Sequence, residues 1–394
     1  MAKRRPQGDG TIRKRSDGRW EARIIIGHKN DGSPMYKSAF AKTQKSALKQ
    51  LHQLIDLYRD VDLTEDSRMT LGEWLDKWLD EYMIFTIRES TLDSYRAMVK
   101  NQVKPFIGSK QISSLTTADM QKFYNKIKKE GRVREHPIHG KSLADSMVRG
   151  VHMMLHEALD AAVKERLLAK NPTNGTTVPK CNYPEKQILG DNQLETFLEA
   201  IKGHEYWCDF FYVEVMTGLR RGEICGLSWG DVDFDRRVAD IRHSYDYMGN
   251  LKATKTKAGT RVLPLSDKTI QVLKAHKETQ FKRYARTNQW RKPEEGYIEQ
   301  TDDSPVISDN SGTRVLPTSL SRWWTEDRAK YGLDGWCLHE FRHTYLTLLA
   351  INGVHPKVMQ ELAGHYSSQI SMDIYTHVNM DSKREAVAAV ASVF

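Results

Sequence analysis

Hydrophobic and polar residues alternate near the start of the chain. Between residues 19 and 26, one side of the pattern holds Trp20, Ala22, Ile24 and Ile26. A period of two predicts a half-buried β-strand, and turn sequences rich in Asp and Gly flank it at 16–18 and 29–33. Strands are expected at 11–15, 19–26 and 35–40. From Thr43 the apolar positions repeat every three or four residues, which predicts a helix that covers the sheet.

Amphipathic helices are predicted next. A polar stretch at 59–68 is typical of a linker, and Trp74, Trp78 and Tyr82 then recur at helical spacing. The expected N-terminal caps are Thr70, Ser90 or Thr91, and Thr116 or Thr117. A longer helix is expected from Ser142 to about Leu168. The aromatic stripes on these helices are expected to form a core.

The last part of the chain is expected to be mostly helical with a small antiparallel sheet. Residues 179–184 are typical of a second linker. Helices are expected from Asp191, from about Tyr206 and through Ile224, and strands at 233–234, 238–243 and 260–265. The predicted fold class is therefore mainly α with small β-sheets (α+β), in three domains at 1–58, 69–175 and 185–394.

Composition narrows the class of protein. No run of about 18 apolar residues exists and no apolar segment follows the basic N-terminus, so neither a membrane span nor a secretory signal is predicted. A cytosolic location follows by default. The four cysteines are scattered without a Cys-x-x-Cys pair, which fits neither a disulfide framework nor a zinc site.

The net charge of +9 is unevenly distributed. Residues 1–50 hold 13 Lys and Arg against 4 Asp and Glu, whereas the remainder holds 47 of each sign. A basic module on a neutral body indicates a polyanionic partner, and strands can present basic side chains to a DNA groove. The strand residues expected to contact DNA are Arg13, Lys14, Arg15, Arg19, Arg23 and Lys37. A solvated basic arm is the alternative.

Five elements in the last domain point to phosphate chemistry. They are the Thr-Gly-Leu-Arg sequence ending at Arg220, a lysine-rich hairpin with Lys255 and Lys257, the pair His339 and Arg342, the Leu-Ala-Gly-His sequence ending at His365, and Tyr375. A guanidinium near a helix start can bind phosphate beside free backbone N–H groups. His339 and Arg342 are three residues apart, so they share one helix face.

In this order the elements resemble the active site of the tyrosine recombinases. The helical block resembles the core-binding domain of that family. The N-terminal sheet resembles the arm-type DNA-binding domain of integrases from phages and conjugative transposons. The resemblance covers nearly the whole chain and implies a DNA integrase that cuts and rejoins strands at specific sites, integrating and excising a mobile element.

The resemblance also implies a role for each residue. Tyr375 attacks phosphorus and forms a 3′-phosphotyrosine, while Arg220 and Arg342 bind the phosphate oxygens. Lys255 protonates the leaving oxygen, with Lys257 as the alternative. The remaining roles are those of His339, which acts as acid and base for the tyrosine proton, and His365, which donates a hydrogen bond to the phosphate. Arg221 is the alternative to Arg220, Glu223 is expected to be structural, and no metal, cofactor or ATP is required.

The implied partners are double-stranded DNA at core and arm sites and three further copies of the chain on two DNA duplexes. An accessory DNA-bending or excision factor is possible, and the setting is the bacterial cytoplasm with the nucleoid. Residues 383–394 predict a short helix with one apolar stripe. Docking on a neighbouring protomer and docking on its own domain are both open.

Three other readings compete with this one. The sequence His-Glu-Phe-Arg-His at 339–343 matches a zinc protease signature, with Glu361 or His365 as a third ligand. That reading leaves Arg220, Lys255 and Tyr375 unexplained, and bound zinc would favour it. A non-catalytic regulator would not need all five elements. A type IB topoisomerase would not need an arm-binding module.

Overall fold

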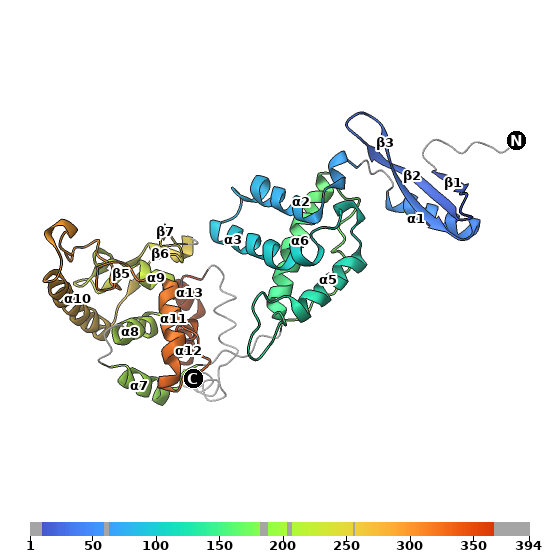
Figure 1. The fold of residues 1–394 in the computed structure, drawn as a ribbon. Coiled ribbons are helices and arrows are strands. Elements are labelled where there is room, and N and C mark those ends of the chain that lie inside the picture. Colours follow the sequence, from blue (N-terminus) through green and yellow to red (C-terminus); the bar gives the residue numbers. More distant parts are fainter. Residues whose placement is uncertain (1–9, 59–62, 182–187, 203–206, 255–256, 366–394) are drawn as a thin grey trace, which may run out of the picture. The chain divides into compact units, whose positions relative to one another are not determined.

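The computed structural model describes residues 10–58, 63–181, 188–202, 207–254 and 257–365 (Figure 1). The chain divides into two compact units, Met1–Tyr183 and Pro184–Phe394. The division falls at the end of the stretch 179–184, where the sequence predicts a linker.

The first unit begins with the predicted sheet. Strands β1 (Thr11–Lys14), β2 (Trp20–His28) and β3 (Pro34–Ala41) pair antiparallel in the order β1-β2-β3. Helix α1 (Gln44–Leu57) follows, and the hydroxyl of Thr43 caps it by accepting the N–H of Ser46. Ala22, Ile24 and Ile26 are buried with the apolar stripe of α1, as the alternation predicts.

The stretch 59–68 is not wholly an exposed linker. Leu63 is buried with the core of the sheet, and its N–H donates to the carbonyl of Ile26 at 2.8 Å. A 3₁₀ turn, Glu65–Arg68, follows. Because the residues around Leu63 are polar, no hydrophobic pattern in the sequence indicates that Leu63 is buried.

A helical group completes the first unit. Its helices are α2 (Leu71–Lys77), α3 (Glu89–Met98), α4 (Lys104–Ile107), α5 (Thr117–Glu130) and α6 (Asp145–Lys164), with π-helical segments at Trp78–Met83 and Val99–Val103 and a 3₁₀ turn at Ile112–Ser114. Thr70 and Thr116 cap α2 and α5 as predicted. Helix α3 starts earlier than predicted, at the cap residue Arg88, and α6 is shorter at both ends.

The aromatic stripes of these helices are buried as predicted. Trp74 and Trp78 are 1% and 2% exposed. The indole N–H of Trp74 donates to the carbonyl of Ala158 in α6 at 2.9 Å, which satisfies the polar atom of a buried ring. The contact therefore joins α2 to α6.

The second unit is mostly helical around two small sheets (Figure 1). Its helices are α7 (Asp191–Ala200), α8 (Trp207–Thr217), α9 (Arg221–Gly226), α10 (Asp267–Asn288), α11 (Pro317–Asp327), α12 (His339–Ile351) and α13 (Pro356–Ala363). The strands are β4 (Val232–Asp233), β5 (Val238–Ile241) and β8 (Arg261–Pro264) in one antiparallel sheet, and β6 (His243–Tyr245) with β7 (Leu251–Ala253) in another. The α+β class is confirmed, although β7 was not predicted.

Aromatic packing fixes the place of α12 in this unit. The ring of Phe341 lies 4.9 Å from that of Phe211 in α8 and 5.3 Å from that of Trp324 in α11. All three are buried. Because Arg342 directly follows Phe341 in α12, this packing also fixes the position of the Arg342 backbone, from which its guanidinium extends. Among the described helices, none is long and apolar enough to cross a membrane.

Replacing Trp74 by Ala should destabilise the helical group by about 3–5 kcal/mol, because it leaves a cavity between α2 and α6 and removes the hydrogen bond to Ala158. Urea unfolding followed by circular dichroism measures this. Trp290→Ala is the matched control, since Trp290 is 86% exposed. Equal losses for both variants would contradict the assigned core.

Candidate active site

A tight turn brings the first arginine into position. Gly218 has φ +60°, and a Cβ there would lie 2.1 Å from Cδ1 of Tyr345, so only glycine fits. The chain then enters α9 with Arg220 as the cap residue. The Thr-Gly-Leu-Arg sequence is therefore a helix end, a left-handed turn and a helix start in succession.

Glu223 is the buried anion of the site. It is 3% exposed and accepts from the backbone N–H of Arg220 at 3.0 Å, from Nη1 of Arg220 at 2.6 Å and from Nη2 of Arg261 at 3.1 Å. Burial alone would raise the pKa of Glu223, but the guanidiniums of Arg261 and Arg220 outweigh it and hold that pKa below its ordinary value. Glu223 is therefore ionised at neutral pH.

The C-terminal end of α13 collects three guanidiniums. The consecutive carbonyls of residues 362–364 accept, in order, from Nε of Arg261 at 2.8 Å, Nη2 of Arg342 at 2.6 Å and Nη2 of Arg220 at 2.7 Å. Gly364 ends the helix with φ +61°. These carbonyls have no partner within the helix, so the arginines satisfy them where the helix dipole is negative.

Arg342 lies deepest in the cluster. It is 2% exposed, and its Nη1 donates to the carbonyl of Gly218. Burial, together with the neighbouring charge of Arg220, lowers the pKa of Arg342 to about 9, so it remains protonated at neutral pH. Burial raises the pKa of Glu214 well above its ordinary value, against the opposing charges of Arg221 and Arg342.

Histidines border the arginines. His365 directly follows Gly364 and is 6% exposed. Burial, and then the charges of Arg342 and Arg220, lower the pKa of His365 to about 4, so its ring is neutral at neutral pH. His339 opens α12, and a positive charge on its ring would lower this pKa further.

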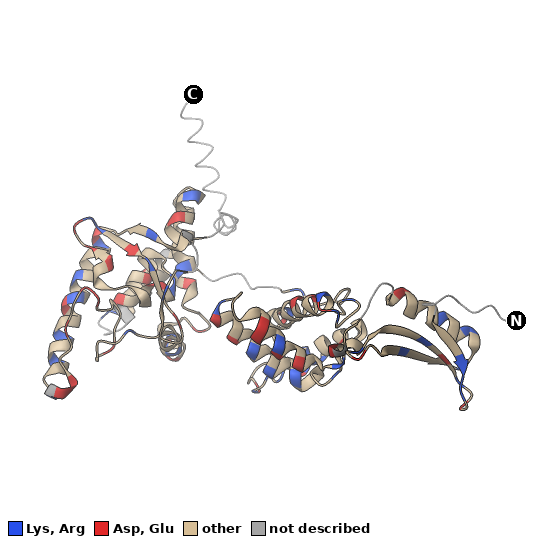
Figure 2. Cartoon of the chain, turned by 90° about the horizontal axis from the view of Figure 1, so that it is seen from above, with Lys and Arg blue, Asp and Glu red and all other residues tan. Residues whose placement is uncertain are grey.

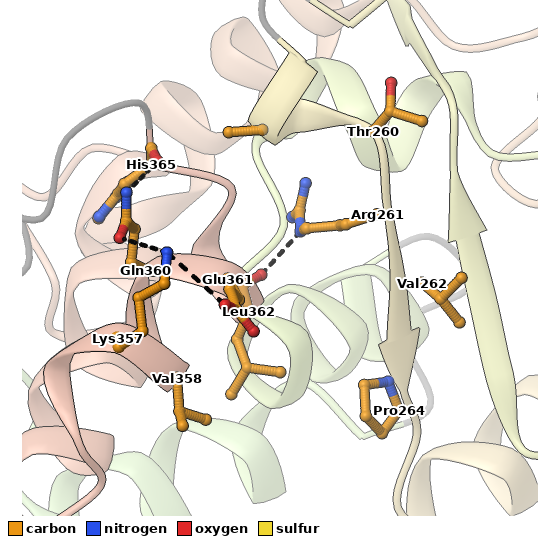
Figure 3. Close-up of a pocket in the computed structure, with 11 residues that line it drawn as sticks. Thr260, Arg261, Val262, Pro264, Lys357, Val358, Gln360, Glu361, Leu362 and His365 are labelled. Atoms are coloured by element: carbon orange, nitrogen blue, oxygen red, sulfur yellow. Dashed lines mark hydrogen bonds and ion pairs between the residues drawn. The ribbon is translucent and has the colours of Figure 1, made fainter.

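The lysine-rich segment borders the same cluster, but it is not the expected hairpin turn, because β7 pairs with β6 and β8 pairs with β5. Lys255 lies outside the described residues, and Lys257 opens a 3₁₀ turn, Lys257–Gly259. The hydroxyls of Thr254 and Thr260 lie 2.8 Å apart and close the base of this loop. A groove of about 420 Å³ lies between β8 and α13, and Figure 3 shows Arg261 and His365 among the residues that line it.

The structure brings Arg220, Arg342 and His365 together, with His339 nearby. Arg221 instead donates to the hydroxyl of Ser321 in α11. Tyr375 lies outside the described residues, as does the expected helix at 383–394.

Sequence reasoning gave Arg261 no role, although its alternation with buried Leu263 along β8 was a signal that both face inward. Glu223, expected to be structural, binds two arginines, Arg220 and Arg261.

The zinc-site alternative finds no support in the geometry. Oε2 of Glu340 accepts the N–H of Cys337 at 2.6 Å and so caps the start of α12. Glu361 lies 3.6 Å from the ammonium of Lys357. Within the described part of the chain, no three His, Cys, Asp or Glu side chains gather as metal ligands would.

The N-terminal sheet leaves one face open. On that face Arg13 donates to buried Glu21 at 2.7 Å, and the guanidinium of Arg23 lies 3.4 Å from the ring centre of Tyr36. The guanidiniums of Arg15 and Arg19 lie 5.3 and 5.6 Å from the ring of Phe40, which is 44% exposed.

Four of the six predicted basic residues therefore gather on one arginine–aromatic face. This name denotes Arg13, Arg15, Arg19, Arg23, Tyr36 and Phe40. In register, Lys14 pairs with Trp20 and Lys37 with Ile24, so these two lie on the side that α1 covers. Figure 2 shows the Lys and Arg residues of the described part of the chain in blue.

Known proteins of one family resemble this chain. A model of the phage integrase family matches residues 187–382, and a model of the SAM-like N-terminal domain of phage integrases matches residues 70–128. A tyrosine recombinase XerC-like protein of Caldanaerobacter subterraneus subsp. tengcongensis is 26% identical over 94% of this chain and 95% of its own length. The transposase of transposon Tn916 from Enterococcus faecalis is 24% identical over 75% of this chain and 71% of its own length.

Solved structures share the fold. The Tn1549 transposon integrase in complex with circular intermediate DNA is 22% identical, covers 82% of this chain and 99% of its own length, and gives a TM-score of 0.66. A lambda integrase dimer bound to a core site is 18% identical, covers 95% of this chain and 96% of its own length, and gives 0.57. Since two models of one family match along the chain and a relative aligns over nearly all of it, the chain belongs to the phage integrase family of tyrosine recombinases.

Proposed function

We propose that this chain cuts and rejoins DNA strands at specific sites through a covalent link between Tyr375 and a 3′ phosphate. In this role it integrates and excises a mobile element as a conjugative-transposon type integrase. The observation that carries the proposal is the convergence of Arg220 and Arg342 beside His365. The coarser conclusion, that the chain is a DNA recombinase, follows from its family.

The cluster has the charge that a phosphodiester needs. Arg220, Arg261 and Arg342 contribute three positive charges, and the carboxylate of Glu223 pairs with Arg220 and Arg261. The side chain of Arg220 is 39% exposed, so one edge of its guanidinium can reach a substrate. Prearranged donors of this kind stabilise the charge that builds on equatorial oxygens in the transition state.

The proposed cleavage moves two protons. The phenolic oxygen of Tyr375 bonds to phosphorus as His339 accepts its proton, and the bond from phosphorus to the 5′ oxygen breaks. Lys255 protonates that oxygen, with Lys257 as the alternative, and His365 donates a hydrogen bond to the phosphate as a neutral ring. Rejoining reverses these steps without ATP, because the phosphotyrosine retains the energy of the broken bond. The guanidiniums supply the charge stabilisation, so the scheme needs no metal.

The assembly is proposed by analogy with named relatives. A solved structure holds a lambda integrase tetramer on a Holliday junction, and it covers 96% of this chain with a TM-score of 0.59. We infer a homotetramer on two duplexes, in which residues 383–394 dock on a neighbour or on their own domain. An accessory DNA-bending or excision factor belongs to the same proposal. The setting would be the nucleoid in the bacterial cytoplasm.

The arginine–aromatic face is proposed to bind arm-site DNA. Arg23 lies over the ring of Tyr36, and Arg15 and Arg19 lie over that of Phe40, which limits the freedom of these side chains before DNA arrives. Strands can enter the major groove and present such side chains to bases and phosphates. Lys14 and Lys37 remain secondary candidates because of their register.

Tyr375→Phe should bind core-site DNA within about twofold of the unchanged chain and form no covalent adduct, because the nucleophilic oxygen is lost. Denaturing gels of reactions on nicked DNA measure the adduct. Tyr366→Phe is the matched control and should retain it. An adduct from Tyr375→Phe would rule out this nucleophile.

Arg220→Ala or Arg342→Ala should slow cleavage by roughly 10²–10³-fold or more, the scale expected for loss of charge stabilisation. Single-turnover cleavage measures this. Arg221→Ala is the comparison, since that side chain contacts Ser321 instead. If Arg221→Ala matched the loss of Arg220→Ala, the assignment of Arg220 would be wrong.

Arg23→Ala should weaken arm-site binding and reduce the slope of log affinity against log salt by about one, because one phosphate contact is lost. Lys37→Ala should change the slope less. Titrations at several salt concentrations measure both. A larger effect from Lys37→Ala would assign DNA binding to the other side of the sheet.

A further inference from the structure

We propose that Arg261 is a positioning residue for strand cleavage. Its guanidinium binds both the C-terminal end of α13 and Glu223 in α9, and these bonds position Arg220 and His365. The inference rests on the proposed function. It concerns a residue whose three guanidinium nitrogens all donate to protein acceptors, so Arg261 acts through its neighbours and not on the substrate.

Arg261 joins three segments that are far apart in the sequence. Nε donates to the carbonyl of Leu362 at 2.8 Å, Nη1 to the carbonyl of Gly259 at 2.9 Å and Nη2 to Oε2 of Glu223 at 3.1 Å. These partners belong to α13, to the 3₁₀ turn Lys257–Gly259 and to α9. Figure 3 shows the side chain of Arg261 directed from β8 toward α13, with the bond to Leu362 drawn.

The bond to Glu223 controls how Arg220 is held. Oε2 of Glu223 accepts from both Arg261 and the backbone of Arg220, while Oε1 accepts from Nη1 of Arg220. Removing Arg261 leaves a buried carboxylate with Arg220 as its one paired cation. Arg220 would then be drawn toward Glu223, which weakens its attraction for phosphate.

The bond to Leu362 controls the end of α13. This carbonyl is the first of the three consecutive acceptors, and those that follow it bind Arg342 and Arg220. His365 is the next residue after these acceptors. Without Arg261, the turn that carries His365 loses one of its three guanidinium anchors.

The residues around Gly364 are tightly packed. A Cβ at Gly364 would lie 2.7 Å from Nη1 of Arg261 and 2.9 Å from the carbonyl oxygen of Ala258. The 3₁₀ turn Lys257–Gly259 and the end of α13 therefore meet at close range. A displacement of Arg261 is passed on to the residues that hold the phosphate, and a shift of about 1 Å can cost on the order of 100-fold in rate.

Arg314 provides a matched control within the same unit. Its guanidinium also binds two carbonyls, of Cys225 and Leu227, and the hydroxyl of Ser228. These partners lie at the C-terminal end of α9, away from Arg220 at its start. Arg314→Gln should lower the melting temperature without coupling to Arg220.

The test is a double-mutant cycle in the full chain, measured by single-turnover cleavage of nicked core-site DNA. Arg261→Gln should slow cleavage about 10- to 100-fold with DNA affinity within about twofold. Added to Arg220→Lys, it should slow cleavage by clearly less than the 10- to 100-fold of the single variant, because much of its effect passes through Arg220. In the control cycle, the effects of Arg314→Gln and Arg220→Lys on the cleavage rate should be independent, so that the double variant shows their product.

Independent, multiplicative effects of Arg261→Gln and Arg220→Lys would overturn the inference, as would an unchanged rate for Arg261→Gln. If Arg261→Gln does not fold, Arg261→Lys replaces it in the double-mutant cycle, and the same outcomes decide. Lysine keeps the positive charge of arginine but lacks its planar fork of donors. If the chain without substitutions formed no covalent adduct with DNA, the proposed function itself would be wrong. The two failures are therefore distinguishable.

Discussion

Three guanidiniums packed side by side repel one another, and the C-terminal end of α13 makes their packing possible. The free carbonyls of residues 362–364 each accept one guanidinium, and the helix dipole places partial negative charge there. Glu223 supplies a full negative charge on the other side of Arg220 and Arg261. The positions of the remaining site residues depend on this arrangement.

The arrangement is only partly neutralised. One carboxylate and a helix end do not cancel three positive charges, so the site keeps a positive excess in a largely buried setting. His365 adds no charge at neutral pH, since its pKa is lowered to about 4. A phosphodiester can supply the missing negative charge, and a transition state with more charge on its oxygens is held more tightly.

The sequence predicted most of the fold because its signals are local, such as the alternation along β2 and the cap at Thr70. Arg220, Arg342 and His365 were recognisable because each lies in a short motif. Arg261 was not, since its decisive contact is with a carbonyl 101 residues away in sequence and depends on the backbone, not on the identity of Leu362. Tertiary contacts of this kind leave little trace in a single sequence.

The central claim is that the arginine cluster binds the reacting phosphate. A structure of the chain on nicked core-site DNA with vanadate at the nick, which imitates the five-coordinate transition state, tests it most directly. The account predicts guanidinium nitrogens of Arg220 and Arg342 at about 2.7–3.1 Å from equatorial oxygens, with the oxygen of Tyr375 in an apical position. Vanadate bound elsewhere, or with neither arginine in contact, would contradict the account.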